Sequence, residues 1–307
     1  MSFVPFKIDF IPTFNEAIDE LIEEGIPRNS FILINGEPGT GKSAVMCELI
    51  YRRLKIGEPV VLLLFQNSPI SVLQRFLGLG WDVLPYIGKG LFKIIDCFSF
   101  RMLDSDNPIK MYVANELVMA KISEEIKIPP DPKDFQSILL TIKSVLQGFD
   151  KNIVSEESNK ILGGILAIDS LTELLTMHNQ EKVLEFVKTI RARLCKERFM
   201  QVIAVNNIGI FDNFNALLSY FMDFILDFRF EPDAMKRGVL LKQFRIRKSS
   251  GTASKNIWLF FEIARNEGLT VPESVLSKVG EAYSSFFGAG QLNENEQNDS
   301  PEKEENE

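Results

Sequence analysis

The stretch FILINGEPGTGKS, from Phe31 to Ser43, decides how the rest of the chain must be organised. It begins with four large apolar residues, which is typical of a strand buried on both faces. Three glycines then fall within six positions, and they allow the backbone to fold back tightly. Beyond Ser43 the sequence favours a helix to about Lys55. The stretch therefore predicts a strand, a tight loop and a helix in that order.

The loop itself, GEPGTGKS, fits the GxxxxGK[ST] pattern of phosphate-binding loops. In such a loop the backbone N–H groups point inward at an anion, and the helix that follows adds its positive end. The lysine reaches the β- and γ-phosphates, and the serine hydroxyl ligates Mg²⁺. A glycine-rich turn without a ligand is the alternative, but the flanking strand and helix disfavour it. The candidate nucleotide-binding residues are Gly36, Glu37, Pro38, Gly39, Thr40, Gly41, Lys42 and Ser43.

An acid at the end of another buried strand is the second half of such a site. The stretch ILAIDS, residues 165–170, supplies Asp169 directly after the apolar run. A carboxylate there would hold Mg²⁺ through water, together with Ser43. The competing interpretation is an acid that only caps the following helix, LTELLTM. The phosphate-loop pattern favours the magnesium role.

The rest of the pattern predicts an α/β fold. A strand at 31–35, a helix at 42–55 and a strand from Val60 make a βαβ unit, which implies a parallel sheet. Further strands are expected at 91–98, 161–169 and 199–207, with helices at 14–24, 69–80, 131–148 and 179–198. Asp134 is a plausible cap for the helix that follows it. Three stretches after residue 223 resemble a meander of antiparallel strands added to the parallel sheet.

Composition limits the function classes. Of the net charge of −8, the last 17 residues carry −6, so the body is about −2 and strong non-specific nucleic-acid binding is not indicated. The three cysteines are far apart, as for reduced thiols of a cytoplasmic protein. We find no apolar run long enough for a membrane span. We expect one domain over residues 1–288, with a variable helical or loop segment at 104–160 and a disordered acidic tail at 289–307.

Several segments together are similar to the KaiC-type branch of the RecA superfamily of P-loop ATPases. They include GIPRNSFILINGEPGTGKS, GWDVLPYIGKGLFKIID, ILAIDSLTELL and FEIARNEGLTV, and the resemblance runs from about Gly25 to Val271. It implies one RecA-like domain, a mostly parallel sheet with helices on both faces. It also implies ATP and Mg²⁺ as ligands, and assembly into rings or filaments in which one subunit completes its neighbour's site.

One departure from the family concerns the residues that position the attacking water. Family members usually end the second core strand in a glutamate pair, and the matching residues here are Gln66 and Asn67. Amides orient water by hydrogen bonds, but they do not accept its proton. General-base assistance is worth roughly 10²–10⁴-fold in rate. The hypothesis is slow or absent hydrolysis. Glu37 lies inside the loop as a candidate to replace the missing carboxylate, and the alternative is that this position simply faces solvent.

Two further assignments depend on the resemblance. In FRIRKSSGT, residues 244–252, Lys248 matches the family lysine that reaches a neighbour's γ-phosphate, but Ser250 replaces the arginine. Strand alternation would put Arg245 and Arg247 on one face and Lys248 on the other. A solvated edge strand is the alternative. Asn206, or its neighbour Asn207, ends a strand where the superfamily often places a polar γ-phosphate sensor; a turn-forming role competes with this interpretation.

The sequence thus favours an ATP-binding protein with weakened hydrolysis, a nucleotide-dependent switch or assembly factor that self-associates and binds a protein partner. An active Mg²⁺-dependent ATPase is the first alternative. A DNA-binding protein of the recombinase-paralogue type is the second, since residues 242–248 are basic.

Overall fold

The structure is a computed structural model, which describes residues 8–101, 122–153, 163–209 and 211–272. The chain divides into two compact units, Met1–Thr270 and Val271–Glu307. Much of the predicted variable segment at 104–160 and the whole predicted tail at 289–307 lie outside the described residues.

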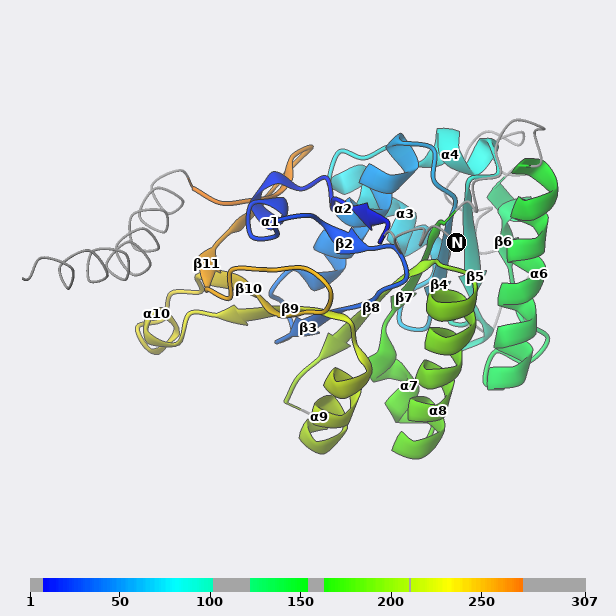
Figure 1. The fold of residues 1–307 in the computed structure, drawn as a ribbon. Coiled ribbons are helices and arrows are strands. Elements are labelled where there is room, and N and C mark those ends of the chain that lie inside the picture. Colours follow the sequence, from blue (N-terminus) through cyan, green and yellow to red (C-terminus); the bar gives the residue numbers. More distant parts are fainter. Residues whose placement is uncertain (1–7, 102–121, 154–162, 210, 273–307) are drawn as a thin grey trace, which may run out of the picture. The chain divides into compact units, whose positions relative to one another are not determined.

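A nine-stranded sheet runs through the first unit (Figure 1). In spatial order its strands are β11 (Leu259–Phe260), β10 (Lys242–Ser249), β9 (Phe224–Phe230), β3 (Phe31–Gly36), β8 (Gln201–Asn207), β7 (Ile165–Asp169), β4 (Val60–Leu64), β5 (Phe92–Asp96) and β6 (Ile126–Lys127). Every pairing from β9 to β6 is parallel, and β10 and β11 are antiparallel additions. This confirms the predicted α/β fold with antiparallel C-terminal strands.

Helices lie on both faces of this sheet (Figure 1). The helices are α2 (Lys42–Lys55), α3 (Pro69–Gly78) and α4 (Leu84–Gly88) on one face, and α6 (Phe135–Ile153), α7 (Leu171–Met177), α8 (Gln180–Ile190) and α9 (Asp212–Phe221) on the other. Asp134 caps α6, because its carboxylate accepts from the Ser137 amide at 2.7 Å. The smaller elements are β1 (Phe10–Ile11), α1 (Glu16–Asp19), β2 (Ile26–Pro27), η1 (Ser99–Arg101), η2 (Arg191–Glu197), α10 (Pro232–Lys236), β12 (Glu262–Ala264) and β13 (Gly268–Thr270).

Strand β3 begins with a continuous apolar run because both of its faces are buried. Phe31 and Leu33 join the core formed with α6, α7, α8 and α9. Ile32 and Ile34 alternate with them and are buried as well. A strand covered on both faces gains hydrophobic stabilisation from every side chain, about 1.5–3 kcal/mol for each large one. The apolar run therefore fixes β3 at the centre of the sheet.

The parallel pairing brings the ends of distant strands together. Asn35 pairs with Asn206 in register between β3 and β8. Leu64 pairs with Asp169 between β4 and β7. Since all these strands run the same way, their carboxyl ends share one edge of the sheet, where ligands bind in open α/β folds. The phosphate loop starts at this same edge, directly after β3.

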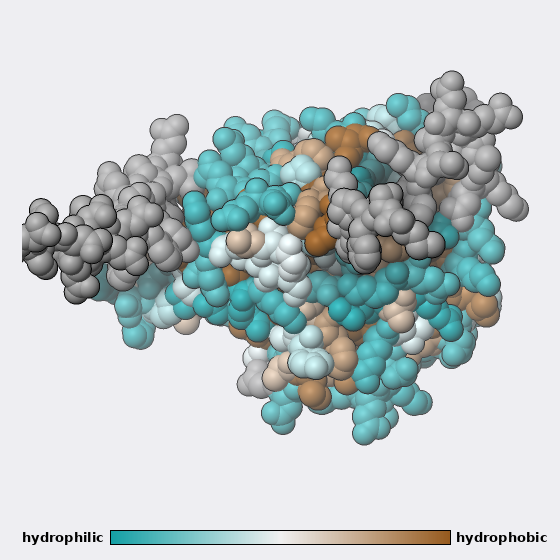
Figure 2. Space-filling model, in the orientation of Figure 1, coloured by the Kyte–Doolittle hydropathy of each residue, from teal (hydrophilic) through white to brown (hydrophobic). Residues whose placement is uncertain are grey.

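The surface in Figure 2 is mostly hydrophilic on the side that it shows, with apolar residues in small patches between. One apolar run is exposed in the connection between β9 and β10. Val239, Leu240 and Leu241 follow one another there, and each is exposed. Consecutive exposed aliphatic residues are uncommon on a surface that contacts only water.

The helix predicted at 179–198 is not α-helical throughout. It changes at Arg191 from α8 into the π-helical segment η2. The wider π turn brings residues five positions apart onto one side. Arg191 and Lys196 accordingly both reach the Asp223 carboxylate, at 2.7 and 3.2 Å. The helical periodicity did not reveal this acid, which comes from a different part of the chain.

The helix predicted at 14–24 is also shorter in the structure. The buried carboxylate of Glu48 holds this region in place. The helix is limited to α1, whose cap is Asn15. The Asn15 amide also donates to the Glu48 carboxylate of α2 at 2.6 Å. Leu269 N donates to the same carboxylate at 2.7 Å and Arg52 Nε at 2.8 Å. Glu48 thus fastens the N-terminal segment and strand β13 to helix α2.

Replacement of Glu48 by alanine should therefore lower the stability of the folded unit. The variant leaves one N–H of the Asn15 amide and the Leu269 backbone N–H buried without an acceptor, so the free energy of unfolding should fall by about 3 kcal/mol. In a thermal melt this corresponds to a decrease in Tm of about 6–12 °C. Glu185→Ala is the control, because Glu185 is exposed and its nearest lysine is 3.9 Å away. Equal melting of both variants would contradict the role assigned to Glu48.

Candidate functional site

The phosphate loop, residues 36–43, connects β3 to α2 as the sequence predicts. A side chain at Gly36 is not possible, since a Cβ there would lie 2.1 Å from the carbonyl oxygen of Phe228 in β9. Gly41 caps α2 with φ at 102°, in the left-handed region that favours glycine. Because Gly36 and Gly41 lack side chains, the loop passes close to β9 at one end and turns sharply into α2 at the other. This path lets the backbone N–H groups of the loop point toward a ligand.

Lys42 holds the loop in this conformation. Its Nζ donates to the Glu37 carbonyl oxygen at 2.6 Å, and the Thr40 hydroxyl donates to the same oxygen at 2.7 Å. The lysine is almost completely buried. Burial lowers the pKa of Lys42 to about 8, although the charges of Glu37 and Asp169 act in the opposite direction. The charge of Lys42 therefore changes with pH close to the physiological range.

Asp169 ends strand β7 and is completely buried. The Ser43 hydroxyl lies 3.5 Å from its Oδ1, so the two predicted magnesium ligands are adjacent. Both offer oxygen, the donor that Mg²⁺ prefers. The geometry and the chemistry of these two groups fit the ion. Among the residues that the structure describes, no three His, Cys, Asp or Glu side chains form a metal cluster.

Arg75 of helix α3 is a site residue that the sequence did not reveal. Its Nη1 lies 3.2 Å from Asp169 Oδ2, and the pair forms a salt bridge. A buried carboxylate needs such a partner, because an unpaired charge in the interior is costly. The only sequence signal is an arginine in the last turn of a helix that follows a core strand, and many surface helices have that.

Gln66 and Asn67 follow one residue after the end of β4, beside the end of β7. The Gln66 backbone N–H donates to the Asp169 carbonyl oxygen at 3.3 Å. The Gln66 side chain is exposed and that of Asn67 is half-buried, so both amides are accessible at the edge of the sheet. The Asp169 carboxylate forms a salt bridge with Arg75. Glu37, inside the phosphate loop, is the other carboxylate considered as a replacement base.

Asn206, the sensor candidate, is enclosed in a hydrogen-bonded cluster. Its amide donates to Asn35 Oδ1 at 2.9 Å and to Asn215 Oδ1 at 2.8 Å. Its own oxygen accepts from the Thr172 hydroxyl at 3.2 Å. Both N–H groups of Asn206 are thus used within the protein, and contact with a phosphate would require one of these bonds to break. The neighbouring Asn207 is half-buried, and its backbone N–H donates to Thr172.

Three of the cations of strand β10 have partners within the chain. Arg245 and Arg247 both bind Asp227, at 3.3 and 2.7 Å. The Lys248 Nζ donates to the carbonyl oxygens of Ser219 and Tyr220, at 3.2 Å each, at the end of α9. The two arginines share Asp227, but Arg247 also donates to the Ser219 hydroxyl at 3.1 Å, and the pairing with β9 is irregular between Ile246 and Lys248. The division of the strand into an arginine face and a lysine face stays a prediction. The role of Lys248 in a neighbouring subunit stays a prediction.

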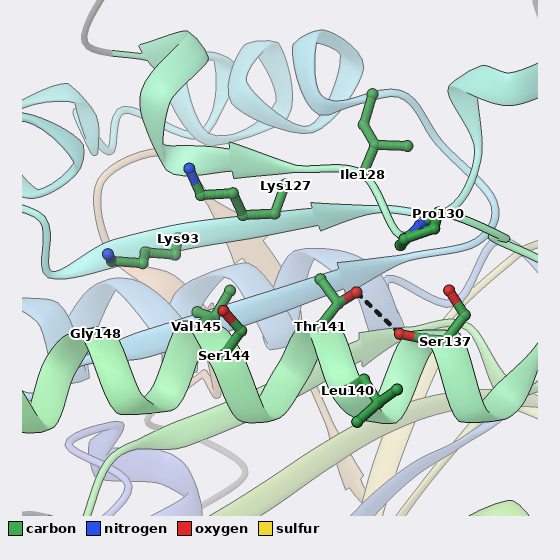
Figure 3. Close-up of a pocket in the computed structure, with 10 residues that line it drawn as sticks. All are labelled: Lys93, Lys127, Ile128, Pro130, Ser137, Leu140, Thr141, Ser144, Val145 and Gly148. Atoms are coloured by element: carbon green, nitrogen blue, oxygen red, sulfur yellow. Dashed lines mark hydrogen bonds between the residues drawn. The ribbon is translucent and has the colours of Figure 1, made fainter.

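A separate cavity of about 470 Å³ lies between α6 and strands β5 and β6 (Figure 3). Lys93 and Lys127 border it from the strands, and Ser137, Thr141 and Ser144 border it from the helix. Lys93 is paired with Glu125 at 3.2 Å. This cavity is at the β6 edge of the sheet and shares no lining residue with the phosphate loop, so it is not the nucleotide site.

Comparison with known proteins identifies the chain's family. A sequence model of the family described as "ATPase: KaiC" matches residues 11–275. The chain belongs to the KaiC-like ATPase family. This confirms the resemblance to the KaiC-type branch of the RecA superfamily, and it supports ATP as the ligand. Within the described part of the chain, no helix is long and apolar enough to cross a membrane.

Individual relatives match over shorter stretches. The UPF0273 protein PH0284 of Pyrococcus horikoshii is 38% identical over 101 residues, which are 33% of this chain and 40% of that protein. The UPF0273 protein SSO1861 of Saccharolobus solfataricus is 31% identical over 135 residues, 44% of this chain and 48% of that protein. The matches thus span less than half the length of these relatives.

A solved structure agrees with the fold. The crystal structure of the KaiC-like protein PH0186 of Pyrococcus horikoshii superposes with a TM-score of 0.63 over 87% of this chain and 100% of that one. The two sequences are 18% identical, so the likeness shows the fold alone.

The burial of Lys42 predicts a pH dependence of ATP binding. Without nucleotide the pKa of Lys42 is about 8, and bound phosphates favour the charged lysine. Affinity should therefore be constant near pH 7 and fall by up to about tenfold per pH unit above pH 8. Equilibrium titration with ATP between pH 7 and 9.5 measures this. Lys42→Arg keeps its charge throughout and should give a flat profile; a flat profile for the unmodified chain would contradict the prediction.

Proposed function

We propose that this chain binds MgATP at the loop of residues 36–43, hydrolyses it slowly, and uses the bound nucleotide as a conformational switch. One observation carries the proposal. The phosphate loop, Lys42, Ser43 and Asp169 are assembled at one edge of the sheet, while amides occupy the adjoining end of β4. Such a site supplies the phosphate cradle and the metal ligands, and it lacks the usual carboxylate pair.

The proposed roles follow from the contacts. Lys42 exchanges the Glu37 carbonyl oxygen for the β- and γ-phosphates, and the backbone N–H groups of the loop bind the same phosphates. Ser43 and Asp169 hold Mg²⁺, which supplies charge neutralisation on the phosphates. Gln66 and Asn67 orient a water molecule by hydrogen bonds but do not remove its proton. Turnover then lacks the contribution of a general base.

The switch follows from what nucleotide must displace. Lys42 is bound to the loop's own carbonyl oxygen, and Asp169 is bound to Arg75 of α3. ATP and Mg²⁺ compete for both groups, so binding alters contacts of the loop and of α3 together. Ligand-dependent reordering of such segments is how nucleotide switches work in general.

Two alternatives receive less support. An active ATPase would need a general base in place of the missing carboxylate pair. Glu37, inside the loop, is the candidate for that role. A DNA-binding role would need accessible cations on β10. There, however, Arg245 and Arg247 already share Asp227, and Lys248 is bound to carbonyl oxygens of α9.

Hydrolysis by the purified chain should be slower than about 1 s⁻¹, an ordinary enzyme rate. The double variant Gln66→Glu with Asn67→Glu restores the carboxylates, and its turnover should rise by at least about tenfold. Phosphate release under saturating MgATP measures both rates. Gln74→Glu is the matched control, since Gln74 is an exposed glutamine on α3. Lys42→Ala removes the phosphate ligand and should abolish turnover. Equal turnover of the double variant and the unmodified chain would show that a missing base is not the limit.

ATP should also change the mass of the protein in solution. We propose self-association, which the family relationship supports and for which the exposed Val239, Leu240 and Leu241 offer an apolar surface. Light scattering after gel filtration, with and without MgATP, measures the mass. Leu240→Glu, at the most exposed of the three positions, should reduce association without weakening nucleotide binding. An unchanged monomer under both conditions would contradict the assembly role.

A further inference from the structure

The Asp169 carboxylate is surrounded by groups of its own chain. Ser43 lies against one oxygen at 3.5 Å, and Arg75 lies against the other at 3.2 Å. No part of Asp169 is exposed. A charge this deep requires a counter-ion in every state of the protein. Arg75 already supplies that counter-ion before any metal ion is considered.

The surrounding elements fix the position of Arg75. Ser68 caps α3, and its oxygen accepts from the Ser71 amide at 3.3 Å. Val72 and Phe76, on either side of Arg75 in the helix, are completely buried. These contacts set the rotation of α3 and direct Arg75 at the end of β7. Arg75 therefore links α3 to the carboxylate at the end of β7.

Arg75 nevertheless has a path away from Asp169. About a quarter of its side chain, 27%, is exposed, whereas Asp169 is enclosed. A long flexible cation at the boundary with solvent is able to leave its partner while the backbone stays in place. Its departure would free Asp169 Oδ2 for another cation.

The charges near Asp169 bear on whether Arg75 or Mg²⁺ binds its carboxylate. Arg75 binds the single carboxylate of Asp169, and Lys42 is a second cation near it, with Glu37 as a further acid beside Lys42. Mg²⁺ would add two more positive charges at the same carboxylate, and like charges at this separation repel. We propose that Arg75 is a built-in counter-ion which competes with Mg²⁺ for Asp169, so that nucleotide affinity in this chain depends only weakly on the metal. This rests on the proposed nucleotide site and concerns its metal requirement.

The affinity for a fluorescent, non-hydrolysable ATP analogue, measured with Mg²⁺ and with EDTA, tests the competition. In the unmodified full-length chain, the Kd in EDTA should exceed the Kd in Mg²⁺ by less than about tenfold, or ~1.4 kcal/mol. Arg75→Gln removes the competing charge and should raise that ratio by at least about tenfold. Arg75→Lys restores a cation and should return the ratio toward the original. Arg191→Gln is the matched control, because it removes an arginine of similar exposure from the buried Asp223.

A second measurement needs no nucleotide. Mg²⁺ alone should leave the Tm of the unmodified chain unchanged, and it should raise the Tm of Arg75→Gln by replacing the lost counter-ion. A ratio above about tenfold in the unmodified chain overturns the inference, and that result does not depend on whether any variant folds. A ratio in Arg75→Gln within about threefold of the original also overturns it. Absence of analogue binding to the unmodified chain, with and without Mg²⁺, overturns the proposed function itself.

Discussion

The charge of Asp169 constrains everything around it. This carboxylate ends a completely buried strand, and the structure surrounds it with polar and charged groups from two other segments. The phosphate loop contributes Ser43, helix α3 contributes Arg75, and Lys42 acts from a greater distance. The position of α3, the depth of the loop and the burial of Lys42 are therefore not independent features. All three reduce the free-energy cost of burying the Asp169 charge in an apolar sheet.

A second buried polar cluster extends from the same edge of the sheet. Asn206 of β8 binds Asn35 of β3, and Asn35 lies 3.5 Å from Asp227 of β9. Asp227 in turn binds the arginines of β10. Side-chain contacts thus continue across four neighbouring strands, from the residue before the phosphate loop to the antiparallel strands. Buried polar groups that satisfy one another in this way favour a single strand arrangement, because any slip leaves several of them unpaired.

Much of this was accessible from the sequence. The apolar run before GEPGTGKS located the central strand, and periodicity located most helices. Asp169 followed from its place at a strand end, since parallel strands must share an edge with the loop. The Arg75 contact was not accessible, because it depends on how far α3 is rotated against β7. The saturation of Asn206 also depends on α7 and α9, which supply Thr172 and Asn215. Local patterns contain no information about which distant elements meet. For the same reason they missed the π turn at Arg191.

The Glu48 contacts have a consequence for where the folded unit can be divided. Helix α2 begins in the phosphate loop, and two turns later it binds Leu269 of β13 through Glu48. Gly268 permits this approach, since a Cβ there would lie 2.1 Å from the Glu48 carboxyl carbon. A shortened chain that stopped after β11 would keep every nucleotide-binding candidate discussed above. It would nevertheless expose one side of the helix that supports the loop. The smallest autonomous nucleotide-binding unit is therefore expected to extend at least to Thr270, about twenty residues beyond the end of β10.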